Sequence, residues 1–177
     1  MREGREFSKE YIDIKTHAAY HEDLEQSLKL YFSVEASSFH LRFVGYEPAK
    51  VDEELGARLA ELELTSTLTV LSAVEAAFRI DYLLRCDLKK KDPISVVFRA
   101  TYKEKGARAR LDEDIFDVWK IHTTGSSRLI GDLKAAFKFR NWLAHGRYWV
   151  HVGPKNDYTT IYALAASAVK SFPLLGS

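Results

Sequence analysis

One stretch of the chain, residues 66–87, is apolar on almost every side of a helix and limits the folds open to the whole sequence. Its middle reads LTVLSAVEAAFRIDYLL. Such a helix needs neighbours on all faces, because only then is its apolar surface removed from water. The rest of the chain also shows helical spacing, without a convincing run of strand-like alternation. We therefore predict an all-α, up-and-down helical bundle with residues 66–87 at its centre.

The remaining elements follow from apolar spacing and from breaking residues. We predict further helices at residues 8–32, 51–64, 94–105, 111–122, 127–145 and 158–172. Thr65 or Ser66 can cap the central helix, and Ser126 or Ser127 can cap the helix at residues 127–145. Residues 37–45 are the only β-like piece, because apolar residues alternate there before a glycine. The expected organisation is an N-terminal helical extension, residues 1–64, packed on a main domain, residues 65–177. A single domain spanning residues 8–173 is the alternative.

Composition indicates a folded chain and excludes several classes of protein. The apolar share is 46% and the aromatic share 12%, which is enough for a core. No run of about 18 apolar residues exists, so we expect no membrane span. The first residues carry no apolar signal, and we expect a soluble cytoplasmic protein. The single cysteine, Cys86, excludes an internal disulfide, and a buried small hydrophobe is favoured over a catalytic thiol.

The charges are unevenly distributed although the net charge is only +1. Residues 1–64 hold 8 basic and 14 acidic side chains, a balance of −6, whereas residues 118–177 hold 8 basic and 2 acidic, a balance of +6. Residues 85–110 are also basic, with 9 basic and 3 acidic side chains. This division either builds a positive surface for phosphate or reflects ordinary solvated helix faces.

Arg140 lies in the middle of an apolar stripe on the predicted helix 127–145. At about 100° per residue, the following residues fall within roughly 60° of it: Leu129, Leu133, Ala136, Phe137, Leu143 and Ala144. An arginine is rarely buried without a partner, because its charge cannot be removed. Three interpretations remain: a pair with a buried acid, a place in a subunit interface, or a site that binds phosphate.

The central helix offers that acid. Glu75 lies among apolar neighbours, and Arg79 follows one turn later. Glu75 can pair with Arg79 at the i, i+4 spacing as a purely structural contact. Alternatively, Glu75 contacts Arg140 and orients it.

His145 follows Arg140 by five residues, about 140° further around an ideal helix. One straight helix cannot direct both side chains to one point. Either the helix opens near Gly146, or two copies of the chain face each other. A histidine before a helix-ending glycine is also typical of a C-terminal cap.

Arginine and histidine together suit RNA cleavage without a metal. Histidine titrates near neutral pH and can act as acid or base. Arginine can hold the phosphate and its developing charge. The 2′-hydroxyl of RNA is the nucleophile, so the protein need not supply one. Asn141 adds a polar group beside the pair.

The string FRNWLAHGR at residues 139–147 resembles the HEPN superfamily, whose members carry an Arg-x4-6-His element near the end of a bundle helix. An upstream helix with an acid, here SAVEAAFR, is similar to that of many bacterial members. The resemblance covers about residues 65–172. It implies a helical domain that dimerises through its motif helices and a metal-independent ribonuclease without cofactors. Arg140, His145 and Asn141 would be catalytic, Glu75 and Arg79 supporting, and Arg147 and Tyr148 possible RNA contacts.

The resemblance also implies partners, namely RNA and an antitoxin or defence complex. It departs from one subgroup, in which a tyrosine two residues after the histidine is modified by a nucleotidyltransferase. Here the tyrosine, Tyr148, comes one residue later, which puts control by adenylylation in doubt. Some HEPN domains keep the motif yet serve mainly as binding or assembly modules. A non-catalytic nucleotide-binding or RNA-binding module, or a helical scaffold with a buried Glu75–Arg140 pair, is therefore the alternative.

Two further groups of residues leave alternatives open. His17 and His21 have a spacing that can hold a metal, against a solvated helix face. Four rings near the motif can stack on unpaired bases or pack in the core or a dimer interface, and these belong to Trp142, Tyr148, Trp149 and His151.

Overall fold

The computed structural model describes residues 13–151, 153 and 157–176, and all regular structure among them is helical. The elements are α1 (Ile14–Tyr31), α2 (Phe39–Arg42), α3 (Pro48–Asp87), α4 (Pro93–Lys105), the 3-10 turn η1 (Gly106–Arg108), the π-helical turn η2 (Leu111–Phe116), α5 (Asp117–His122), α6 (Ser127–Ala144) and α7 (Tyr158–Ser171). The predicted all-α bundle is confirmed.

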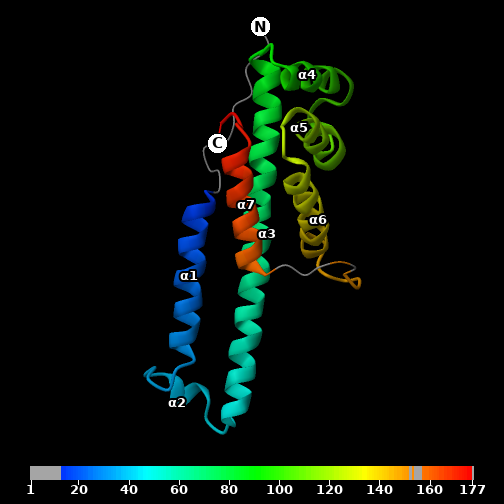
Figure 1. Cartoon of the computed structure of the whole chain (residues 1–177). Coiled ribbons are helices and arrows are strands. Elements are labelled where there is room, and N and C mark those ends of the chain that lie inside the picture. The colour runs from blue at the N-terminus through cyan, green and yellow to red at the C-terminus, as the bar shows by residue number, and fades with distance from the viewer. Residues whose placement is uncertain (1–12, 152, 154–156, 177) are drawn as a thin grey trace.

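Helix α3 is the axis of the molecule. It is 40 residues long and packs against α1, α4, α6 and α7 (Figure 1). Two separate helices, 51–64 and 66–87, were the expectation, and this is wrong. Thr65 does not cap a helix, because its hydroxyl donates to the Glu61 and Leu62 carbonyls within α3. No proline or positive-φ residue interrupts the chain there, and α3 begins at Pro48, whose missing N–H costs nothing in a first turn.

The apolar core lies along the second half of α3. Its largest fully buried side chains include Phe78, Tyr82 and Trp119. A second, smaller cluster lies at the other end of α3, where Phe32 and Phe43 pack with residues of the first α3 turns. The expected extension, residues 1–64, therefore contributes a small cluster of its own, and the boundary expected at 64/65 falls inside a continuous helix.

The β-like prediction for residues 37–45 is wrong, because α2 lies within them. Phe39 and Phe43 are one helical turn apart and both contact the small cluster. Leu41, between them, is exposed. Two of the three alternating apolar residues, Phe39 and Phe43, are therefore also at the i, i+4 spacing of a helix. Residues at that spacing share one face of a helix.

One helix start and one helix cap also differ from expectation. α1 begins at Ile14 rather than at residue 8, because Asp13 is extended and its carboxylate accepts from the N–H groups of Lys15 and Thr16; residues 8–12 lie outside the described residues. Ser126 precedes α6, but its hydroxyl donates to the Thr123 carbonyl rather than capping the helix. The helix itself is confirmed, from residue 127 to 144.

Candidate functional site

Glu75 joins Arg79 and Arg140 into one network. Its Oε1 lies 2.7 Å from Nε of Arg79, and its Oε2 lies 3.1 Å from Nη2 of Arg140. Arg79 also donates from Nη1 to the Ala109 carbonyl at 3.0 Å. The two pairings that the sequence left as alternatives therefore occur together, one on each carboxylate oxygen.

The network is half-buried where α3 and α6 pack. The side chains of Glu75, Arg140 and Arg79 are 20%, 26% and 37% exposed. Nε of Arg140 is buried without a hydrogen-bond partner, and Nη1 reaches Oδ1 of exposed Asn141 at 3.4 Å. Two guanidinium groups share one carboxylate, which leaves one positive charge at a surface that solvent reaches.

Arg140 occupies the kind of position that the apolar stripe indicated. Leu133, Ala136 and Phe137 on the same helix are buried against the core. The stripe directs Arg140 towards α3, where Glu75 meets it. The predicted partner is confirmed, whereas a role in binding phosphate stays a prediction.

His145 is the C-cap residue, directly after the last residue of α6. Beyond it, the Gly146 N–H donates to the Leu143 carbonyl at 3.2 Å and the Arg147 N–H to the Trp142 carbonyl at 3.1 Å. These two bonds form a Schellman motif, in which Gly146 takes a φ of +79°. The His145 ring is exposed and lies 5.9 Å from the Trp149 ring. Among the described residues, no hydrogen bond or ion pair joins His145 to Arg140.

Arg147 is held by a residue far away in the sequence. Its Nη1 and Nη2 lie 2.8 and 3.1 Å from the two carboxylate oxygens of Glu61 on α3. Its φ of +60° is uncommon for a residue other than glycine. This pair ties the turn after α6 to the first half of α3. Tyr148, the other expected RNA contact, is exposed.

A buried ion pair that the sequence analysis missed lies further along α3. Asp81 accepts from Nε of Arg85 at 2.8 Å and from the Leu175 N–H at 2.8 Å. Arg85 also donates to Asp92 and to the Pro173 carbonyl. Burial raises the pKa of Asp81, and the Leu175 N–H and Arg85 oppose that rise. The sequence feature that could have indicated this pair is an acid followed by an arginine at i+4 inside an apolar helix.

The prediction that His17 and His21 lie on a solvated helix face is wrong for His21. Its ring is buried, its Nδ1 lies 2.8 Å from the Ser66 hydroxyl, and it stacks on Tyr158 with ring centroids 3.8 Å apart. Burial, followed by the neighbouring His21, lowers the pKa of His17. No group of three or more metal-ligating side chains occurs among the described residues.

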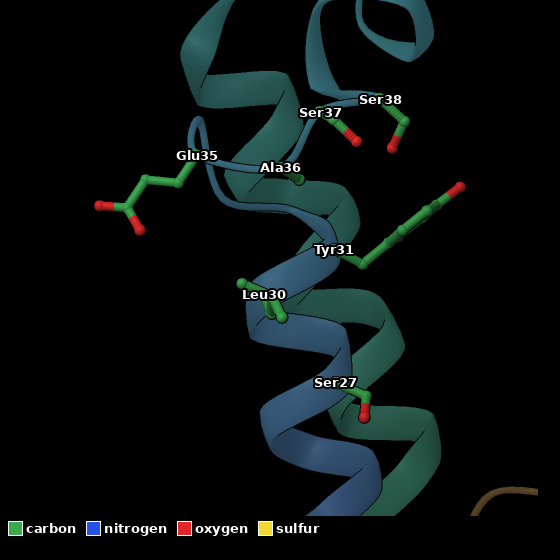
Figure 2. A pocket seen from close by; sticks show the side chains of 7 residues that line it. All are labelled: Ser27, Leu30, Tyr31, Glu35, Ala36, Ser37 and Ser38. Carbon is green, nitrogen blue, oxygen red and sulfur yellow. The ribbon is translucent and has the colours of Figure 1, made fainter.

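Two other features lie apart from the Glu75 network. Cys86 is buried, which confirms its interpretation as a small hydrophobe. A shallow depression at the turn from α1 to α2 is lined by Ser27, Tyr31 and Ser38 among others, and Glu35 points away from Tyr31 there (Figure 2). It contains none of the residues expected to act on RNA.

Comparison with known proteins does not assign the chain to a family. The chain matched no family model, no curated protein and no solved structure. Within the part of the chain that the structure describes, no helix is both long enough and apolar enough to cross a bilayer.

Proposed function

We propose that this chain is a metal-independent endoribonuclease of the HEPN type that cuts single-stranded RNA or tRNA as a homodimer, in a toxin–antitoxin or antiphage defence setting. The observation that carries the proposal is the contact between Arg140 and Glu75. It fixes a half-exposed guanidinium on α6, five residues before an exposed histidine. A cation fixed in advance stabilises a developing phosphate charge without having to reorganise.

Arg140 would bind the scissile phosphate. Glu75 neutralises only one of the two guanidiniums that contact it, so the network keeps a positive charge for an anion. Asn141 is exposed next to Arg140 and would contact the backbone or ribose.

His145 would move the proton. The 2′-hydroxyl oxygen attacks phosphorus and gives its proton to a base, while the bond from phosphorus to the 5′-oxygen breaks and that oxygen takes up a proton. The products are a cyclic phosphate and a 5′-hydroxyl, as the HEPN resemblance implies. An imidazole can serve as the base or the acid at neutral pH.

A second copy of the chain would complete the site. Arg140 faces α3, whereas His145 lies beyond the end of α6 and is exposed. Two copies facing each other through this end of α6 would bring two arginines and two histidines into one cleft. This requirement gives the proposal a simple physical test, because a monomer would lack the site.

The decisive experiment is RNA cleavage in EDTA, on tRNA and on unstructured RNA. We expect Arg140→Ala and His145→Ala to lose at least about 100-fold in rate. Matched controls are Arg128→Ala, on the same helix with a side chain 96% exposed, and His122→Ala at the end of α5. Unchanged cleavage by His145→Ala, or an active protein that sediments as a monomer, would refute the proposal.

A scaffold or non-catalytic binding module is the second candidate, and one observation favours it. The Glu75 network joins α3, α6 and the Ala109 carbonyl, as a structural contact would. If Arg140→Ala unfolds the protein and the parent cuts no RNA, this candidate is preferred.

A further inference from the structure

The aromatic residues in the last turns of α6 and just after it divide into an inner and an outer set. In the inner set, Trp142 stacks on Phe139 with ring centroids 5.6 Å apart, and His151 lies 5.1 Å from Phe139. In the outer set, Tyr148 and Trp149 contact each other with centroids 4.4 Å apart and planes at 85°. Packing within the fold therefore explains the inner rings and leaves the outer rings without such a role.

The outer rings are presented on a fixed backbone. The Schellman bonds hold residues 145–147 at the end of α6. The Trp142 indole N–H donates to the Trp149 carbonyl at 2.7 Å and fixes the chain at the second ring. The segment extends beyond the end of α6 (Figure 1). Tyr148 is nevertheless 82% exposed, and Val150 after it is also exposed. The turn after α6 thus exposes an aromatic side chain, that of Tyr148, to solvent.

His145 and Arg147 border this aromatic surface in the chain. His145, the proposed acid or base, lies 5.9 Å from Trp149. Arg147 precedes Tyr148 and is paired with Glu61, and the segment that carries these residues, 118–177, has a balance of +6 from 8 basic and 2 acidic side chains. A ligand that suits both features has flat rings and negative charge, which describes a nucleotide with an unpaired base.

We infer that Tyr148 and Trp149 form a stacking platform for an unpaired base next to the cleaved phosphate, so that the site selects single-stranded over duplex RNA. The bases of a duplex are already stacked on each other and offer no free face to a protein ring. The platform rests on the proposed function only in that RNA is the ligand. Both rings are exposed, Tyr148 to 82% and Trp149 to 40%.

Binding of 2′-O-methylated RNA tests the platform separately from cleavage, because this RNA lacks the nucleophilic hydroxyl. The probes are an unstructured oligonucleotide and a duplex of the same composition, titrated against the full chain. We expect the parent to prefer the single strand. Tyr148→Ala and Trp149→Leu should each weaken single-strand binding by about 5- to 100-fold and leave duplex binding nearly unchanged. Tyr20→Ala, an exposed tyrosine on α1, is the matched control.

The outcomes separate the platform from its rivals. A parent that binds neither probe, or a Tyr148→Ala variant with parental single-strand affinity, overturns the platform. So does a Tyr148→Ala variant that dissociates a dimer while each chain keeps its RNA affinity, because the rings would then serve the subunit interface. Single-strand binding that depends on Tyr148, in a parent that cuts no RNA, supports the platform and refutes the ribonuclease.

Discussion

The guanidinium of Arg140 on α6 lies 3.1 Å from the carboxylate of Glu75 on α3, and the same carboxylate binds Arg79 through its other oxygen. One acid thereby holds two arginines from two helices. Because Arg79 also contacts the Ala109 carbonyl, the network reaches the chain between η1 and η2. Its members are all partly exposed, so the network joins elements of the fold and is also reached by solvent.

Glu75→Gln tests the structural effect of this network. The amide keeps the size of the side chain but removes the charge that two guanidiniums share, and we expect the free energy of unfolding to fall by about 1–3 kcal/mol. Urea denaturation measures it. The control is Glu25→Gln, which removes an exposed i, i+4 pair with Lys29 and should change stability by less than about 0.5 kcal/mol. Equal effects of the two substitutions would show that the network contributes no stability.

Asp81→Ala should be among the most destabilising substitutions in the chain. It leaves Arg85 buried without its nearest carboxylate and frees the Leu175 N–H. We expect a loss of about 3–5 kcal/mol, measured by chemical denaturation. Asp132→Ala, which removes an exposed pair with Arg128 on α6, should cost about 0.5 kcal/mol or less. A small loss for Asp81→Ala would contradict the buried pair.

Gly146→Ala and Gly131→Ala should have opposite effects. Gly146 has a φ of +79°, which an alanine adopts only with strain, and we expect a loss of about 1 kcal/mol. Gly131 lies inside α6, and a Cβ there would meet open space, so alanine should gain up to about 1 kcal/mol. Thermal unfolding of both variants measures the difference, and effects of the same sign would argue against the turn described after α6.

The stability of the fold should depend on pH through His17. Its pKa is lowered below 6.5, mainly by burial, so the unfolded chain binds a proton more readily than the folded one. Neutral His17 therefore makes its full contribution to the free energy of unfolding above pH 6.5. That contribution is lost progressively as the pH falls below 6.5. We expect His17→Leu to lose less stability than the parent between about pH 7.5 and pH 5.5 in urea titrations. Leu30→Ala, at an exposed position on α1 without a titratable group, should follow the parent. A His17→Leu profile parallel to the parent's would contradict the burial of this ring.

Much of the Glu75 network could be predicted because it follows from helical periodicity. The spacing put Arg140 among apolar residues and named Glu75 as a partner, and both are confirmed. The sharing of Glu75 between Arg79 and Arg140 could not be predicted, since it depends on the distance between α3 and α6. The Glu61–Arg147 pair was missed for the same reason, because it joins residues that only the tertiary structure brings together.

The sequence by itself determined that the chain is helical, that residues 66–87 are central and that an arginine faces the bundle, because apolar spacing dictates which side of a helix is buried. Only the tertiary structure decided that α3 is one uninterrupted helix, since a hydroxyl such as that of Thr65 can cap a helix or continue one. It also decided which ring near the end of α6 packs on the fold and which is exposed. Trp142 lies on the helix and packs inward, whereas Tyr148 lies beyond the Schellman turn and is exposed.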